Sequence, residues 1–210
     1  MTTDQQDFEA KLAVVHARQE IANLQARYLY YTQSHEYDLL LELFDFADPE
    51  VSVEISSTGV YVGEERIRAL YLELFKPLFT SAGSLPIHMA NTPCIEIAPD
   101  GLSATGMWQT IGCNAFPTKD GLQATWQQGK YDNAFTCREG VWLFKRFRWL
   151  CNFRTPFDQG WVECPMTMVE PLDLSHFPER CHPSRPSEPY PGYDPDKPMD
   201  FGPLPPERSE

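Results

Sequence analysis

One long helical stripe constrains what the N-terminal part of this sequence can fold into. From residue 10 to residue 35, small, aliphatic and aromatic side chains recur at alternating spacings of four and three, at Ala10, Val14, Ala17, Ile21, Leu24, Tyr28, Tyr31 and His35. These spacings place all of them on one face of a single α-helix. The last two turns of the stripe are polar and aromatic rather than aliphatic. Either the end of the helix emerges at the surface, or it lines a cavity.

Three shorter elements are predicted between this helix and residue 80. Asp38 suits the N-cap of a short helix over 39–46. Apolar and polar residues then alternate over 51–56, the pattern of a half-buried strand, and Gly59 turns the chain into a partner strand over 60–62. Gly63 opens a third helix with one apolar face, made of Ile67, Leu70, Tyr71, Leu74 and Leu78.

The second half of the sequence changes to the period of strands. Four long strands are predicted over 87–98, 102–116, 122–137 and 141–153. The segments between them carry hairpin-type residues, Pro99-Asp100-Gly101, Lys119-Asp120-Gly121 and Arg138-Glu139-Gly140. Two or three helices followed by an antiparallel meander indicate an α+β fold, in which a strongly curved sheet is covered by helices on one side. Such a sheet and its helices enclose a cavity.

A proline-rich segment follows this domain. Residues 1–165 are expected to form the α+β domain, and residues 166–210 an extended arm, because 183–206 holds nine prolines and little apolar periodicity. The arm is either a floppy tail or a segment that packs on something, plausibly a neighbouring subunit. Four side chains favour packing: Tyr190, Tyr193, Met199 and Phe201.

Composition excludes several classes of function. The formal net charge of −13 argues against nucleic-acid binding, which normally shows a basic footprint. No apolar run approaches the roughly 20 residues of a membrane span. The polar, acidic N-terminus is not a signal peptide, and six cysteines without paired spacing are read as reduced thiols, so a cytoplasmic protein is expected. No metal site is expected. The candidate ligands Cys164, His176, Cys181 and His182 are not spaced in the pairs that are typical of metal-binding motifs.

In their order and spacing, the motifs over residues 10–160 resemble the SnoaL-like branch of the nuclear transport factor 2-like superfamily. The resemblance rests on Arg27-Tyr28, the 39–46 helix leading to Asp48, Gly63, Ile87-His88-Met89, Gly140-Val141-Trp142, Asn152 and Thr155-Pro156. It implies a cone-shaped α+β barrel with a pocket between the helices and the concave face of the sheet. Enzymes of this superfamily include dehydratases, a dehydrochlorinase, cyclases, isomerases and formaldehyde-releasing lyases, and most need no metal or organic cofactor.

The resemblance also implies catalytic positions. In the eliminating members, a histidine early in the sheet acts as the base, and here it falls on His88; the hydrogen-bond donor falls on Tyr28. The aspartate that partners the histidine falls on Gln33, which can orient an imidazole but cannot counter its charge. The nearest substitutes in sequence are His35 and Glu36.

Further residues are expected to line the pocket. Tyr31 lies one turn from Tyr28, and the family register places Trp108, Thr110 and Tyr131 on the concave face. Alternation adds three glycines that would leave room for a flat ligand, Gly106, Gly112 and Gly129. On the last strand, alternation puts Phe147 and Trp149 inside and Arg146 and Arg148 outside unless a bulge intervenes, with Asn152 near the mouth.

The leading hypothesis is a cofactor-independent lyase or dehydratase that eliminates water or formaldehyde from a hydrophobic aromatic small molecule. An isomerase or cyclase, and a non-catalytic small subunit of a ring-hydroxylating dioxygenase, are the alternatives. A homo-oligomer, with residues 183–206 lying across a neighbour, is expected from an outer sheet face that would expose Trp126, Trp142 and Phe144. The resemblance implies a trimer, and a dimer is the alternative.

Overall fold

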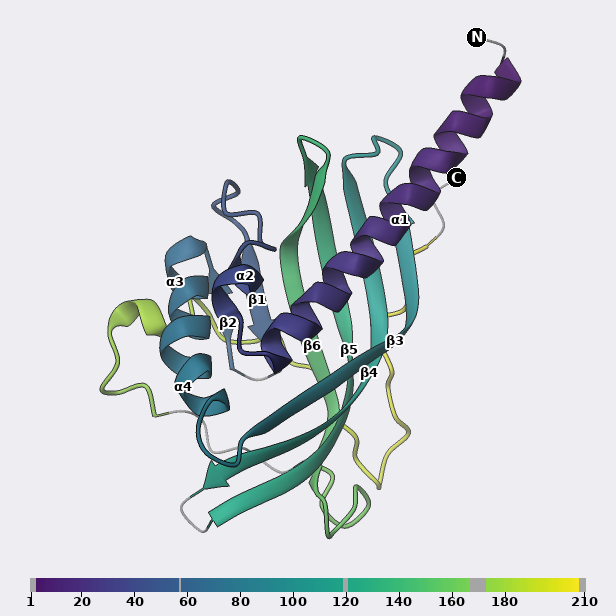
Figure 1. The fold of residues 1–210 in the computed structure, drawn as a ribbon. Coiled ribbons are helices and arrows are strands. Elements are labelled where there is room, and N and C mark those ends of the chain that lie inside the picture. The colour runs from purple at the N-terminus through teal and green to yellow at the C-terminus, as the bar shows by residue number, and fades with distance from the viewer. Residues whose placement is uncertain (1–2, 57, 119–120, 167–172, 208–210) are drawn as a thin grey trace.

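The fold is a long helix laid across one face of a curved six-stranded sheet (Figure 1). The computed structural model describes residues 3–56, 58–118, 121–166 and 173–207. The strand order is β2-β1-β6-β5-β4-β3, with only β1 and β6 parallel. The strands are β1 (Ser52–Ile55), β2 (Val60–Val62), β3 (Leu85–Ile97), β4 (Ser103–Thr118), β5 (Gly121–Arg138) and β6 (Val141–Pro156). The predicted α+β class is confirmed, although this sheet stays open and does not close into a barrel.

The four strands predicted after residue 85 correspond to β3, β4, β5 and β6, with ends that differ by a few residues. At the β5–β6 turn, Glu139 and Gly140 both have positive φ angles, 50° and 82°, as a two-residue type I′ hairpin requires. The predicted turn residues Lys119 and Asp120 lie outside the described residues.

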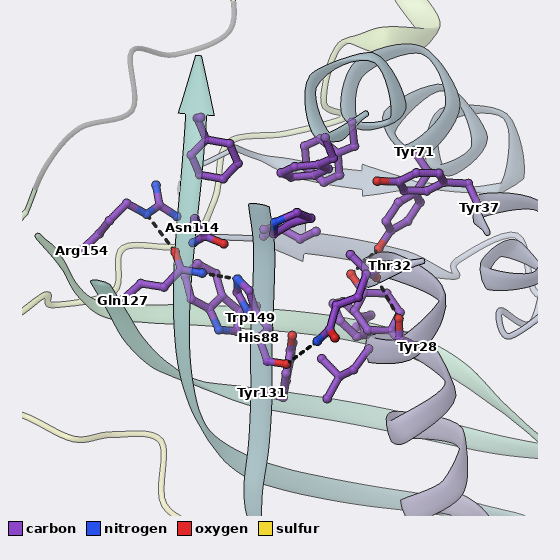
Figure 2. A pocket seen from close by; sticks show the side chains of 18 residues that line it. Tyr28, Thr32, Tyr37, Tyr71, His88, Asn114, Gln127, Tyr131, Trp149 and Arg154 are labelled. Atoms are coloured by element: carbon purple, nitrogen blue, oxygen red, sulfur yellow. Dashed lines mark hydrogen bonds between the residues drawn. The ribbon is translucent and has the colours of Figure 1, made fainter. Parts of the chain in front are cut away.

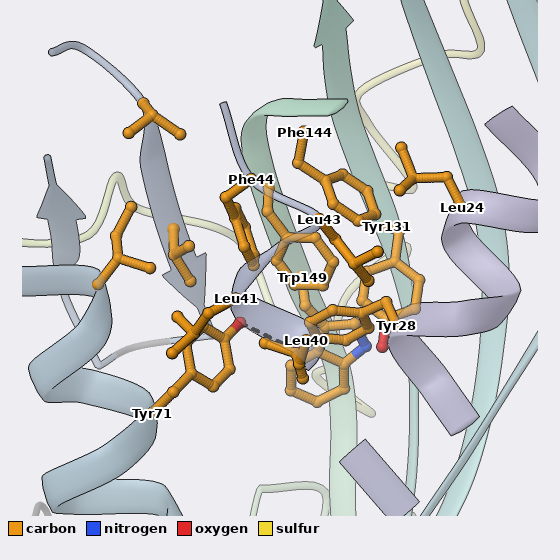
Figure 3. Close-up of a cluster of buried hydrophobic side chains, with 14 of the residues drawn as sticks. Leu24, Tyr28, Leu40, Leu41, Leu43, Phe44, Tyr71, Tyr131, Phe144 and Trp149 are labelled. Carbon is orange, nitrogen blue, oxygen red and sulfur yellow. Dashed lines mark hydrogen bonds between the residues drawn. The ribbon is translucent and has the colours of Figure 1, made fainter. Parts of the chain in front are cut away.

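The helix α1 (Thr3–Gln33) buries only part of the predicted stripe. Ala17, Ile21, Leu24 and Tyr28 are buried, and they pack with residues of the sheet in the hydrophobic core. Figure 3 shows Leu24 and Tyr28 in this core. The first turns extend past the sheet (Figure 1), so the predicted core positions Ala10 and Val14 are exposed.

The second helix is shorter and earlier than predicted. The helix α2 (Tyr37–Leu41) ends before the segment 43–45, which was expected to be helical. This segment instead pairs in parallel with the first residues of β6, at Phe44 and Phe144. Leu43 O accepts a hydrogen bond from Phe144 N at 2.9 Å, and Asp45 N donates to Phe144 O at 2.9 Å. Pairing with a strand therefore overrides the local helical pattern.

A π-helical turn interrupts the third predicted helix. Gly63 (φ 83°) precedes α3 (Glu64–Ala69), which continues as a π-helix η1 (Leu70–Phe75) and then as α4 (Lys76–Phe79). Tyr71 and Phe75 both lie in this π-helical segment, and both are buried. Such turns are rare and occur frequently at functional sites.

Two register shifts in the β5–β6 pairing correct the predicted outer face. Phe144 pairs with Phe135, but Arg146 pairs with Ala134, so Lys145 is an extra residue. Phe144 and Phe147 therefore both face the core although they are three residues apart. Trp142 is 8% exposed and Phe144 is 0% exposed. The prediction that Trp142 and Phe144 form an apolar patch with Trp126 on the outer face is therefore wrong. It no longer supports an interface with a second copy of the chain.

Strand β1 is also buried more completely than its alternating pattern predicts. Ser52 and Glu54 are buried together with Val53. Arg148 forms an ion pair with Glu54 at 2.8 Å and a second one with Glu188 of the proline-rich arm at 3.2 Å. A polar outer face can be buried here because its charges are paired under the arm.

The described part of the arm (173–207) packs on its own chain. Its short helix η2 (Glu179–Cys181) contacts α3 and η1, where Glu179 lies 3.0 Å from Arg66 and Arg180 lies 2.8 Å from Glu73. From about residue 183 the arm runs along the face of the sheet opposite α1 (Figure 1). Tyr190 donates a hydrogen bond to Asn152 Oδ1 at 2.5 Å, and Tyr193 N donates to Asn152 O at 2.6 Å. Farther along, the ammonium of Lys130, a residue only 3% exposed, donates to the carbonyl oxygens of Phe201, Gly202 and Pro203. The expectation that this arm lies across a neighbour gains no support from these contacts.

No helix within the described ranges is both long enough and apolar enough to cross a membrane.

The three hydrogen bonds from Lys130 to the carbonyl oxygens of Phe201, Gly202 and Pro203, here called the Lys130 cage, predict that the end of the arm stabilises the fold. Deleting residues 201–210 removes three acceptors of a charged donor, which should lower the free energy of unfolding by about 1–3 kcal/mol. In a Lys130→Met background the same deletion should cost clearly less, because no ammonium remains to be satisfied. Urea unfolding of the four proteins measures this coupling. Equal costs in the two backgrounds would show that the cage contributes nothing.

Candidate active site

A small cavity of about 100 Å³ lies between the C-terminal half of α1, the η1 turn and the concave face of the sheet (Figure 2). Its walls are largely aromatic, with Phe75, Phe79, Phe116, Phe147 and Trp149 among them. The polar side chains gather at two ends. Tyrosines from the helices lie at one end, and His88 lies at the other with side chains from β4, β5 and β6.

At the polar end, three side chains form a row that ends on the imidazole of His88 (Figure 2). Arg154 Nε donates to Gln127 Oε1 at 3.1 Å, and the amide nitrogen of Gln127 meets His88 Nε2. Because a guanidinium can only donate, it fixes which end of the Gln127 amide faces the histidine. The amide N–H then donates to Nε2, so the neutral imidazole carries its proton on Nδ1.

The environment of His88 disfavours the imidazolium form. Burial, and then the positive charge of Arg154, lower the pKa of His88 to about 4. The indole ring of Trp149 lies edge-on to the imidazole, with 5.3 Å between ring centroids. Within the described chain, no Asp or Glu side chain contacts this imidazole. At neutral pH His88 is therefore uncharged and able to accept a proton.

Gln33 lies in the pocket but does not reach the imidazole. Its Nε2 donates to the backbone carbonyl of His88 at 2.8 Å, and this bond ties the end of α1 to β3. The expectation that Gln33 orients the ring is wrong in this geometry, since Gln127 does so. His35, just past the end of α1 with φ 61°, stacks on Tyr37 and does not line the cavity. Glu36 is exposed.

The tyrosine end contains two phenols that the sequence did not indicate, those of Tyr37 and Tyr71. Tyr28 and Tyr71 share a hydrogen bond of 3.1 Å between their hydroxyls. Burial raises the pKa of Tyr28 to about 12, and it also raises the pKa values of Tyr37, Tyr71 and Tyr131. All four phenols are therefore neutral hydrogen-bond donors at pH 7. The hydroxyl of Tyr37 is buried without a hydrogen-bond partner, which leaves it available to a ligand.

Six of the predicted site residues meet at the cavity, and five do not. Those that line it are Tyr28, Gln33, His88, Tyr131, Phe147 and Trp149; those that do not are Tyr31, His35, Trp108, Thr110 and Asn152. Trp108 is buried in the core beside Phe135, and Thr110 Oγ1 accepts a hydrogen bond from Trp149 Nε1 at 3.1 Å, so it holds a wall residue in place. Tyr31 is partly buried against the core.

Asn152 and the three glycines differ from expectation for reasons of packing. A second register shift, at Gln128 and Gly129, makes Asn152 an extra residue that faces the arm rather than the mouth of the pocket. A Cβ at Gly112 would lie 2.5 Å from Ile87 O, and one at Gly129 2.1 Å from Leu150 O. At Gly106 it would lie 2.7 Å from the indole of Trp108. The glycines make room for protein atoms, not for a ligand.

Five functional candidates escaped the sequence analysis: Tyr37, Tyr71, Asn114, Gln127 and Arg154. Alternation through Gly112 could have added Asn114, and Tyr71 was assigned to the apolar face of its helix. Arg154 faces inward only because of the second bulge. Among the described residues, no group of three His, Cys, Asp or Glu side chains is arranged as a metal site.

A family model for a SnoaL-like domain matches residues 13–148, which is more than half of the chain. The chain belongs to the SnoaL-like family. A search of curated protein sequences finds no match.

Solved structures share the fold of this SnoaL-like protein at low sequence identity. A type 2 hexachlorocyclohexane dehydrochlorinase (LinA) aligns with a TM-score of 0.61 and 19% identity, over 71% of this chain and 95% of that one. LinA-type3 from Novosphingobium barchaimii LL02 gives 0.59 and 18%, over 71% and 96%. A candidate scytalone dehydratase from Novosphingobium aromaticivorans DSM 12444 gives 0.54 and 15%, over 80% and 100%. These similarities establish the fold.

The lowered pKa of His88 should appear in the pH dependence of stability. Between about pH 6.5 and pH 4, the unfolded chain binds a proton at residue 88 that the folded chain excludes. This proton should lower the free energy of unfolding as pH falls through that window, by up to about 3 kcal/mol. Above pH 6.5 the contribution should be absent.

Urea unfolding at several pH values, compared between the wild type and His88→Gln, measures this effect. The curve of the variant should be flatter between pH 4 and 6.5. His16→Gln, which changes an exposed histidine of α1, is the matched control and should follow the wild type. Parallel curves for the wild type and His88→Gln would contradict the assignment.

Proposed function

We propose that the protein is a lyase that eliminates water or formaldehyde from a small aromatic compound without a cofactor, with His88 as the proton acceptor. The observation that carries the proposal is a neutral, oriented imidazole in an aromatic cavity, opposite a phenol that lacks a partner. Membership in the SnoaL-like family supports it, and so do the names of the dehydrochlorinase and dehydratase structures that share the fold.

The two ends of the pocket have different roles, one accepting a proton and the other donating a hydrogen bond. Once substrate displaces the Gln127 amide, His88 Nε2 accepts a proton from the substrate. For loss of water, the proton comes from the carbon next to the one that bears the hydroxyl; a C=C bond forms as the C–O bond breaks, and the departing hydroxide takes the proton back from the imidazolium and leaves as water. For loss of formaldehyde, the proton comes from the hydroxyl of a CH₂OH group; its C–C bond breaks, formaldehyde leaves, and the imidazolium returns the proton to the carbon that carried the group.

Tyr37, whose hydroxyl is unpartnered, donates a hydrogen bond to the oxygen on which negative charge develops. Tyr28 was expected to be that donor. Its bond to Tyr71 makes it a positioning residue that holds the tyrosine end together.

The expected alternative of a non-catalytic subunit is less well supported. A pocket that serves only an interface should be filled with aliphatic side chains. Here the pocket keeps a partly exposed imidazole, a buried phenol without a partner and a buried amide oxygen without a partner, on Asn114. Leaving such groups unsatisfied costs stability, which is tolerated where a ligand satisfies them.

A panel of aromatic alcohols and phenolic diols, analysed by mass spectrometry for loss of water or formaldehyde, tests the reaction. With any substrate that turns over, His88→Ala should lower kcat by roughly 10²–10⁴, because proton transfer is lost. His16→Ala on the surface is the control. A product of unchanged mass would identify an isomerase instead, and turnover by His88→Ala within a few-fold of wild type would remove His88 from the mechanism.

The role of Tyr37 has its own test. Tyr37→Phe removes one hydroxyl without changing the ring, and it should lower kcat by roughly 10² if the phenol stabilises developing charge. Tyr30→Phe is the matched control, because Tyr30 is 70% exposed on α1 and lies outside the pocket. Equal activity of both variants would show that the Tyr37 hydroxyl takes no part.

A further inference from the structure

Arg154 is a cation without a carboxylate partner, among the described residues, in a pocket whose walls are largely aromatic. Its only side-chain hydrogen bond within the described chain runs from Nε to Gln127, and no Asp or Glu there lies within ion-pair distance. On the same strand but the opposite face, Arg146 pairs with Asp132 at 2.9 Å and Arg148 with Glu54 at 2.8 Å. The chain has 30 acidic residues against 17 Lys and Arg. A shortage of acids therefore does not explain the exception.

The geometry of Arg154 leaves its binding edge open. The guanidinium carbon lies 5.8 Å from the Trp149 ring centroid, and Nε is held by Gln127, so the planar group is fixed on two sides. Nη1 and Nη2 make no hydrogen bond to the described residues. Two parallel N–H donors of this kind match the two oxygens of a carboxylate. Arg154 is half-buried, so its guanidinium is partly removed from water without an ion-pair partner among the described residues, and an anionic ligand would offset that cost.

A second group at the same end of the pocket also lacks a partner. Asn114 is buried, its Oδ1 has no hydrogen-bond partner, and Figure 2 shows it beside Gln127 and Arg154. The cavity therefore presents a fixed cation and an unsatisfied amide at one end, and the Tyr37 hydroxyl at the other. Its volume of about 100 Å³ is below the ~150 Å³ of a cavity that holds one benzene ring, which limits a ligand to a single ring.

We propose that the substrate is a small aromatic carboxylate, whose carboxylate binds Arg154 beside Asn114 and whose ring packs on Trp149. This inference rests on the proposed function, since it names the substrate class of the same pocket. Tyr37 then faces the part of the substrate remote from the carboxylate.

The bound carboxylate would also change the base. The ionisable groups around the pocket that face His88 are Arg154 of β6, Tyr131 of β5 and the tyrosines of α1, α2 and η1, and only Arg154 is charged at pH 7. Burial and then the charge of Arg154 lower the pKa of His88, and an anion on the guanidinium offsets the second of these two effects. No Asp or Glu among the described residues contacts His88, and Gln33 occupies the position where the family resemblance implies an aspartate. The carboxylate of the substrate thus supplies the negative charge that this aspartate would have supplied.

Calorimetric titration with benzoate and with benzamide, its neutral analogue of similar shape, tests the carboxylate site. The wild type should bind benzoate about 10–100-fold more tightly than benzamide, as expected for a charge-assisted pair of hydrogen bonds. Arg154→Gln should abolish this preference. Arg146→Gln, on the outer face of the same strand, should keep it. Arg154→Lys, which keeps the charge without the planar fork, should show an intermediate preference and serves if Arg154→Gln does not fold.

A second readout follows the His88 ring signals by NMR across pH. Saturating benzoate should move the midpoint of the His88 titration upward from about pH 4, and benzamide should not. The proposal is overturned if benzoate does not bind, if it binds no better than benzamide, or if Arg154→Gln retains the preference. Kinetics of His88→Ala keep the two proposals separate: unchanged turnover would reject the proposed lyase mechanism while a benzoate preference that depends on Arg154 would stand.

Discussion

The pairing of β6 with β5 decides which side chains reach the inside of this molecule. Each of its two register shifts adds one residue to β6, at Lys145 and at Asn152, and each reverses the inward and outward alternation beyond it. The first shift places Phe144 as well as Phe147 in the core. The second turns Arg154 into the pocket and Asn152 toward the arm. Without them, the charged and aromatic faces of the last strand would exchange places along part of its length.

This dependence explains how much the sequence could predict. The period of α1 was sufficient to place Tyr28 on the buried face, and the order of helices and hairpins was sufficient for the α+β class. Simple alternation correctly put Phe147 and Trp149 inside and Arg146 and Arg148 outside. It failed at Phe144 and Asn152, because nothing local in the sequence announces a bulge that the partner strand imposes. Tyr37 escaped because its helix begins before the capping residue that was expected to precede it.

The chemistry of the site follows from what holds the histidine. A carboxylate partner would stabilise the imidazolium and make His88 a stronger base. Here a neutral amide, fixed by a guanidinium, holds Nε2 instead, and burial together with the nearby positive charge lowers the pKa of His88. A base of this kind remains uncharged well into the acidic range. His88 is a weak base in the empty pocket. A negative charge placed beside Arg154 would raise the pKa of His88 and make it a stronger base.

The arm has a consequence for the order in which the molecule can be completed. It follows every strand in sequence, and its contacts run from β2, where Arg185 pairs with Val60, to Lys130 on β5. Those contacts need strands that are already paired, so the arm can dock only on a finished sheet. During synthesis, the ammonium of Lys130 therefore lacks its three carbonyl acceptors until the last part of the chain has emerged. The nascent domain presents a charged outer face, which discourages contact with other sheets while the protein is incomplete.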